Sequence, residues 1–236
     1  MFTSKTIAVY LRTSSATNYK ELYNGYYTIQ KLALISLLTL SVSAFAAEKQ
    51  GSYGGIELGY LGLQNEAQDS ANALVRAFGG SASVTSDSGM AVGRLFGGYN
   101  FNENIGIELG AYRTSDFDQT ASGTTSGGAY TARATLYNYG VDGSFLLRPN
   151  ISTGLNNLFV RFGGHWSETN ADASFAGSVA GNTWAYQRGT GWLAGVGYDA
   201  DVSKDVSVRI SWTHRDRIAG SDYYANIGMI GAKFNF

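Results

Sequence analysis

The sequence predicts an all-β chain folded as a transmembrane antiparallel up-and-down β-barrel of eight strands. Three observations lead to this fold class. Stretches in which apolar and polar residues alternate recur along the chain, as in strands with two different faces. Short turns alternate with long connections, as in transmembrane barrels. Only 15% of the 236 residues are charged, whereas 14% are aromatic and 31 residues are glycine, a composition that suits strands exposed to lipid.

The composition also excludes several other classes of protein. No stretch approaches the ~20 apolar residues that a spanning helix needs, and the glycines lack the period of collagen. The sequence contains no cysteine, which removes disulfides, thiolate metal sites and thiol nucleophiles together. A formal net charge of −1 gives no reason to expect nucleic acid as a partner.

The first element is an export signal. After Lys31 the chain reads LALISLLTLSVSAFAA, an apolar core that ends in the small-x-small pattern of a cleavage site. A short membrane anchor is the alternative, but this run is too short to span. We expect cleavage after Ala46, or after Ala47, so that 1–46 is removed and 47–236 forms the barrel. The thirty residues before the signal are long for such a segment, and we interpret them as an overcalled start of translation.

Eight alternating stretches follow the signal, and each has roughly the ~10 residues that cross a bilayer at a strong tilt. The strands are expected near 52–63, 89–100, 105–114, 130–147, 158–167, 185–199, 206–215 and 224–236. Their connections are of two kinds. The turns after the second, fourth and sixth strands are the shorter ones, and long loops are expected at 64–88, 115–129 and 168–184. Residues 82–85 leave ten strands open as an alternative, if they form a hairpin within the first loop.

One face of each strand is apolar and aromatic, and the other is small, polar or charged. In the third strand, Ile107 and Leu109 alternate with Gly106 and Glu108. Because charges recur on the polar face of almost every strand, we predict that this face lines the lumen and that the apolar face meets lipid. Backbone groups in lipid need internal partners, so the sheet must close. Aromatic residues at both ends of the outward face predict two interfacial girdles.

The inward positions carry a belt of charged residues, the candidate site, which we call the lumen network. Its members are Glu57, Arg94, Glu108, Asp142, Arg161, Asp199, Arg209 and Lys233. Around the circumference Arg94 lies between Glu57 and Glu108. Arg161 is expected between Asp142 and Asp199, and Lys233 beside Glu57. Side chains can fill an eight-stranded barrel, so we predict a plugged lumen, with a gated ion path through the network as the alternative.

The run GGYNFNENIGIELG over 97–110 resembles the strand–turn–strand of OmpA-type and OmpX-like eight-stranded outer-membrane barrels. The opening GGIELGY at 54–60 is similar to the same group. So is the ending IGAKFNF, whose Phe234 and Phe236 resemble the signal read by the barrel-assembly machinery. The resemblance implies the barrel domain alone, without the peptidoglycan-binding domain of full OmpA proteins. It also implies an outer-membrane location in contact with lipid and lipopolysaccharide, periplasmic termini, long loops outside, and roles in envelope integrity, adhesion or narrow-pore behaviour.

Catalytic constellations are sparse in this sequence. His165 and Ser167 invite comparison with the His-x-Ser of outer-membrane lipid A deacylases. Their parity places both on the lumen face, away from lipid, and Val179 stands where that family has an acid. We therefore predict no catalytic residue, no cofactor and no metal site. The sequence favours a structural or surface-interacting barrel that binds extracellular ligands through its loops, with a narrow small-solute channel as the alternative and a lipid A-modifying enzyme third.

Overall fold

The computed structural model describes residues 50–62, 81–125, 127–149, 157–177 and 180–236. The expected export signal and residues 64–80 of the first expected loop lie outside these ranges. No helix among the described residues is long and apolar enough to cross a membrane.

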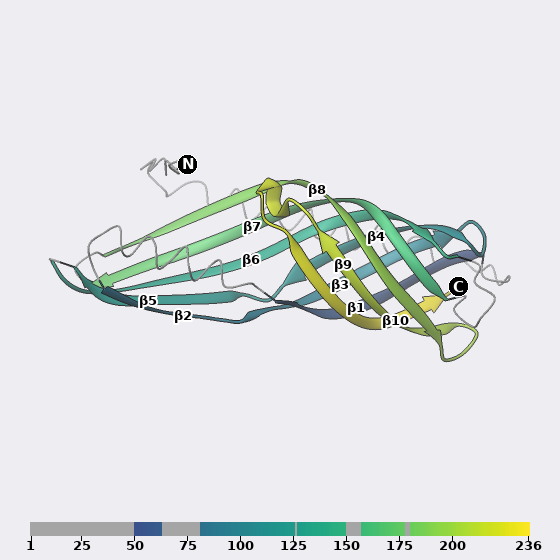
Figure 1. Ribbon diagram of the computed structural model, residues 1–236, viewed down its shortest axis with the longest axis horizontal. Helices are drawn as coiled ribbons and strands as arrows, with labels where there is room; N and C mark the ends of the chain where they lie inside the picture. The colour runs from purple at the N-terminus through teal and green to yellow at the C-terminus, as the bar shows by residue number, and fades with distance from the viewer. Residues whose placement is uncertain (1–49, 63–80, 126, 150–156, 178–179) are drawn as a thin grey trace, which may run out of the picture. The chain divides into compact units, whose positions relative to one another are not determined.

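Antiparallel strands form one sheet that closes on itself (Figure 1). The strands are β1 (Gly51–Gly62), β2 (Ser81–Ser86), β3 (Gly89–Asn100), β4 (Ile105–Thr114), β5 (Phe117–Thr125), β6 (Gly128–Leu147), β7 (Leu158–Gly177), β8 (Gly181–Asp201), β9 (Val206–Arg215) and β10 (Ala225–Asn235). Around the barrel the order is β1-β3-β4-β6-β7-β8-β9-β10, and β10 pairs with β1. Eight strands therefore close the barrel, as the alternation predicted, and closure leaves no strand edge in hydrocarbon.

The remaining two strands continue β3 and β4 beyond the barrel. Only residues 87–88 separate β2 from β3, and only residues 115–116 separate β4 from β5. β2 pairs with β5, and β5 pairs with the first part of β6. β6, β7 and β8 have 20, 20 and 21 residues, about twice the ~10 that cross a bilayer. Together these strands raise a five-stranded extension on one side of the described barrel, whereas β1, β9 and β10 end at its rim (Figure 1).

The prediction of long loops at 115–129 and 168–184 is therefore wrong, because most of these residues lie in the strands β5, β6, β7 and β8. Their Ser, Thr, Ala and Gly content suggested loops, since such residues give weak contrast between the two faces of a strand. Residues 82–85 do lie in a strand, β2, and its described partner is β5.

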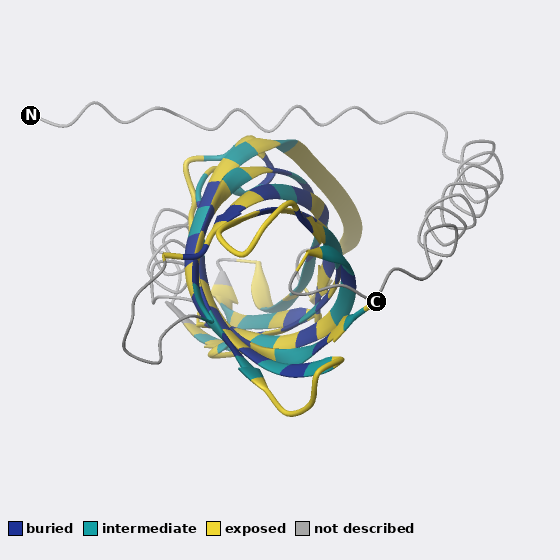
Figure 2. Cartoon of the chain, turned by 90° about the vertical axis from the view of Figure 1, so that its right-hand side faces the viewer, coloured by how far each residue is buried: buried dark blue, intermediate teal, exposed yellow. Residues whose placement is uncertain are grey.

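The two faces of the barrel strands have the predicted orientation. Leu109 and Phe162 point outward and are 69% and 63% exposed, whereas Glu108 and Arg161 point inward and are each 1% exposed. Buried and exposed residues alternate around the whole ring of strands (Figure 2). A water-soluble barrel would have the opposite arrangement, so the outer face is the one that meets lipid.

Exposed aromatic side chains gather at both ends of this outer face. Near the short turns they are Tyr99, Phe101, Phe145, Phe234 and Phe236, and toward the extension they are Tyr60, Trp192 and Trp212. These two sets are the girdles expected at the two membrane interfaces.

The lumen is not polar along its full length, which corrects the prediction. Toward the extension an apolar cluster fills it, made of Leu61, Met90, Val92, Tyr112, Phe117, Ala225, Ile227 and Met229, with Leu136 and Ile218 packed against them. All but Ile218 come from strands, at inward positions. The charged residues therefore occupy the half of the lumen nearer the short turns, and apolar side chains close the other half.

Candidate functional site

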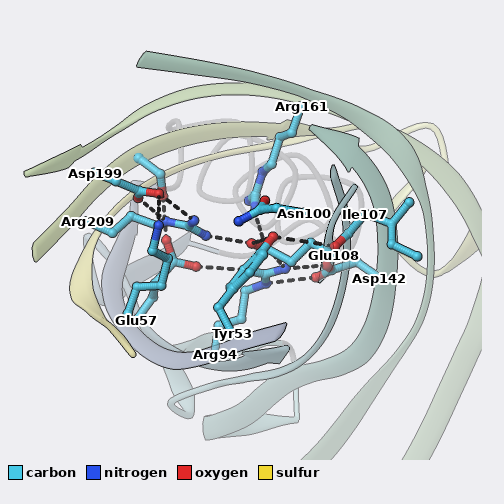
Figure 3. A network of polar contacts seen from close by, with 12 residues as sticks. Tyr53, Glu57, Arg94, Asn100, Ile107, Glu108, Asp142, Arg161, Asp199 and Arg209 are labelled. Atoms are coloured by element: carbon cyan, nitrogen blue, oxygen red, sulfur yellow. Dashed lines mark hydrogen bonds and ion pairs between the residues drawn. The ribbon is translucent and has the colours of Figure 1, made fainter. Parts of the chain in front are cut away.

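Arg94 of β3 is the centre of the lumen network (Figure 3). Its Nη1 donates to Glu57 at 2.7 Å, and its Nη2 donates to Glu108 at 2.9 Å and to Asp142 at 2.6 Å. Gly110, on the neighbouring strand β4, makes room for this guanidinium, because a Cβ there would lie 2.5 Å from Arg94 Nη2. One buried cation thus holds three carboxylates from three strands.

Arg209 of β9 is the second hub. Its Nη1 donates to Glu108 Oε2 at 2.6 Å. Its Nε and Nη2 donate to the two carboxylate oxygens of Asp199 at 2.6 and 3.1 Å, in a bidentate ion pair. The guanidinium carbon lies 4.6 Å from the ring centroids of both Phe96 and Phe159. The aromatic faces stabilise the charge of a guanidinium that is fully buried.

Glu108 joins the two hubs, because its Oε1 accepts from Arg94 and its Oε2 accepts from Arg209. β4 and β9 lie on opposite sides of the ring, so the contact with Arg209 crosses the lumen. A chain of ion pairs therefore runs from Asp199 on β8 to Asp142 on β6. This chain fills the middle of the lumen (Figure 3).

Hydroxyl groups complete the coordination of two carboxylates. Tyr53 donates to Glu108 at 3.2 Å, and Ser211 donates to Glu57 at 2.8 Å. Buried carboxylates are stable only when their lone pairs are engaged, so these neutral donors are part of the network.

The eight residues singled out from the sequence all line the lumen, but the neighbours predicted for two of them are wrong. Arg161 contacts Glu108 at 3.4 Å and Thr213, not Asp142 and Asp199. Lys233 pairs with Asp199 at 2.7 Å, not with Glu57. Long side chains reach across a narrow barrel, so order around the circumference does not determine which charges meet.

Two arginines of the network were missed. Arg215 Nη2 donates to Asp142 Oδ2 at 2.7 Å, and Arg148 Nη1 donates to Asn100 at 2.8 Å. Both follow the inward parity of their strands. Continuing the alternation of β9 to its last residue would have found Arg215.

His165 and Ser167 face the lumen, as their parity predicted, and both hold the connection between β9 and β10. His165 Nε2 lies 2.8 Å from the carbonyl of Asp216, and Ser167 Oγ accepts from the backbone N–H of Ala219 at 2.8 Å. Ala219 belongs to the short 3-10 helix η1 (Ile218–Gly220). Within the described ranges no group of three or more His, Asp or Glu side chains is placed to hold a metal ion.

A closed barrel with an apolar outer band, two aromatic girdles and an ion-paired lumen defines an integral outer-membrane β-barrel protein. The chain belongs to the outer membrane protein beta-barrel domain family, whose model matches residues 32–236.

Solved structures of similar fold were also found. One is the structure of Ail, the attachment invasion locus protein of Yersinia pestis, in complex with the heparin analogue sucrose octasulfate. Its sequence identity is 15% and its TM-score is 0.42, and the match covers 79% of this chain and 99% of that chain. Neisserial surface protein A is 15% identical with a TM-score of 0.41, and the match covers 79% of this chain and 97% of that chain. The outer membrane protein OprG from Pseudomonas aeruginosa is 12% identical with a TM-score of 0.40, and the match covers 80% of this chain and 98% of that chain. A search of curated protein sequences gives no match.

Proposed function

We propose that the protein is a structural, surface-interacting barrel whose extension is a contact surface outside the cell, and that it is not an enzyme. The observation that carries this proposal is the pair Trp184 and Tyr186 on the outer face of β8. Their rings stack at 5.9 Å and 10°, and the side chains are 69% and 49% exposed. Exposed aromatic rings held on a rigid sheet are typical of binding surfaces.

The position of this pair argues against a role in anchoring the barrel in lipid. Trp192 belongs to the girdle near the rim, and Trp184 lies eight residues further along the same strand. At ~3.3 Å per residue, this separation is roughly 26 Å along β8. The neighbouring outward residues are polar: Asp172 pairs with Trp184, and Asn170 with Tyr186. An aromatic pair among polar side chains, beyond the girdle, is available to a partner outside the membrane.

The lumen network supports the same proposal against a small-solute channel. The hubs Arg94 and Arg209 are joined through Glu108 across the axis, and all three side chains are buried. Opening a path would separate buried ion pairs, at ~3–5 kcal/mol for each partner left alone. We therefore propose that the barrel does not conduct solutes.

Adhesion of cells tests the contact surface. Cells producing the protein are compared with cells lacking it on surfaces coated with extracellular-matrix proteins and glycans. Trp184→Ala with Tyr186→Ala should abolish the added adhesion, and Phe175→Ala, on the inner face of β7, is the matched control. Two results together would contradict this proposal: equal adhesion with and without the protein on every coating, and a stable large conductance in planar bilayers. They would favour a small-solute channel instead.

We further propose that residues 1–46 are removed on export, that residues 47–236 form the mature barrel, and that Phe234 and Phe236 are read by the barrel-assembly machinery. The outward exposure of both side chains on or beside β10 supports the last point. N-terminal sequencing of the membrane-embedded protein tests the cleavage site. Replacing both residues by Ala should leave the processed chain unassembled in the periplasm.

A further inference from the structure

The described lumen holds more buried cations than buried carboxylates. The cations are Arg94, Arg148, Arg161, Arg209, Arg215 and Lys233, and the carboxylates that face them are Glu57, Glu108, Asp142 and Asp199. The one other buried carboxylate among the described residues, Glu168, lies at an outward position of β7 beside Tyr139. Buried charge without a counter-charge is strongly unfavourable. The described network is therefore short of negative charge.

Arg215 makes only one ion pair in the described network. Its side chain is 1% exposed, and its Nη2 donates to Asp142. Its Nε and Nη1 have no hydrogen-bond partner among the described residues. These two nitrogens carry three of the five N–H groups of an arginine. Besides Asp142, this guanidinium interacts with the neutral hydroxyl of Tyr112, so it lacks a second anionic acceptor.

Asp142 cannot balance Arg215 by itself, because Arg94 already engages it. Arg94 donates to Asp142 Oδ1 at 2.6 Å and to Oδ2 at 3.1 Å, and Arg215 shares Oδ2 at 2.7 Å. Arg161 adds a further positive charge, since its Nε also has no described partner and its nearest carboxylate contact is 3.4 Å long. Arg94, Arg161, Arg209 and Arg215 thus share Asp142 and Glu108, and only Arg94 and Arg209 have a further carboxylate, Glu57 and Asp199 respectively.

The surroundings limit what kind of group supplies the missing charge. The guanidinium carbon of Arg215 lies 3.8 Å from the ring centroid of Tyr112, so one face of the group is covered. Tyr112 belongs to the apolar cluster that fills the lumen toward the extension. Between an apolar cluster and an ion-pair network, the group must be small, anionic and able to accept hydrogen bonds from N–H groups.

We propose that a small monovalent inorganic anion, chloride in the cell, binds beside Arg215 inside the barrel. It accepts hydrogen bonds from Arg215 and balances the excess positive charge of Arg215 and Arg161. The site is structural: the anion belongs to the packed lumen and is not transported. This inference stands apart from the adhesion proposal, because it concerns the lumen and not the extension.

Crystals of the purified barrel soaked in sodium bromide test the site directly. The expected result is an anomalous peak inside the lumen within hydrogen-bond reach of Arg215, absent in Arg215→Gln. Bromide only on the outer surface, with water beside Arg215, would overturn the proposal. The wild-type crystal decides this point even if the variant does not fold.

Thermal unfolding in detergent gives an independent measurement. The midpoint is compared in sodium chloride and sodium gluconate at equal ionic strength, because gluconate is a much larger anion than chloride. Chloride should raise the midpoint of the wild type, and Arg215→Gln should remove the difference. We expect this variant to fold, since Asp142 keeps its bonds to Arg94.

Arg113→Gln is the matched control for this measurement. Arg113 also lies over an aromatic ring, 5.1 Å from the centroid of Tyr137, but it is exposed on the outer face. Its loss should leave the difference between chloride and gluconate intact. Equal midpoints in the two salts for the wild type, or an unchanged difference in Arg215→Gln, would contradict an anion at Arg215.

Discussion

The same strands have opposite polarity in the two regions that they cross. In the barrel, β6 and β7 point Phe145 and Phe162 outward and Asp142 inward. In the extension, the same strands point Thr131 and Asp172 outward, and the inward residues are small or apolar, such as Ala132, Ala134, Ala171 and Ala173. The strand alternation does not change between the regions, but the solvent does: lipid surrounds the barrel and water surrounds the extension. A period of two therefore shows that a strand has two faces, and the charges show which face meets which solvent.

The largest effect is expected from removing the cation at the centre of the barrel region. Arg94→Ala leaves Glu57, Glu108 and Asp142 buried without their shared partner, so we expect a loss of ~3–5 kcal/mol in the free energy of unfolding. Urea unfolding in lipid vesicles measures it. Arg133→Ala, on the outer face of the extension, should stay within about 0.5 kcal/mol. A loss below 1 kcal/mol for Arg94→Ala would mean that the lumen network adds little to stability.

A charge placed on the outer face tests whether the barrel and the extension meet different solvents. Leu109→Arg puts a cation where the barrel meets hydrocarbon, and we expect a cost of ~2–4 kcal/mol, measured in the same vesicles. Thr131→Arg makes a similar change on the outer face of the extension and should cost almost nothing. Equal costs at the two positions would show that both regions meet the same solvent.

A methyl group tests how tightly the lumen is filled. Gly110→Ala places a Cβ 2.5 Å from Arg94 Nη2, so the guanidinium must move, at a cost of ~1–3 kcal/mol. In Gly93→Ala, the new Cβ meets only Leu58 Cδ2, at 3.9 Å on the outer face, and we expect little change. Equal unfolding midpoints for the two variants would contradict a packed lumen.

The smallest effect on stability is expected in the extension. Trp184→Ala removes an aromatic ring that is mostly exposed, so the free energy of unfolding should change by less than about 0.5 kcal/mol. Urea unfolding measures it beside the adhesion assay. A loss comparable with that of Arg94→Ala would show that the ring packs in the fold and does not form a surface for partners.

The barrel strands were predictable because lipid gives a strong contrast between neighbouring positions, as between Glu108 and Leu109. The extension was not, because Ser122 and Ala121 differ too little for alternation to be distinguished from a loop. Inward parity selected the residues of the lumen network but not their partners. Lys233 meets Asp199 past the intervening strand β9, and such a pairing depends on the curvature of the closed barrel, which a sequence pattern does not contain.

The bond between Glu108 and Arg209 joins residues 101 positions apart and spans opposite walls of the barrel. The two walls face each other in this way in the closed ring, whose seam is the pairing of β1 with β10. Before the ring closes, the sheet presents bare carboxylates and guanidinium groups on an open surface, which hydrocarbon does not tolerate. Closure of the ring and pairing of Glu108 with Arg209 are thus coupled in folding. A partly closed sheet would leave these charges facing hydrocarbon and would be unstable in the bilayer.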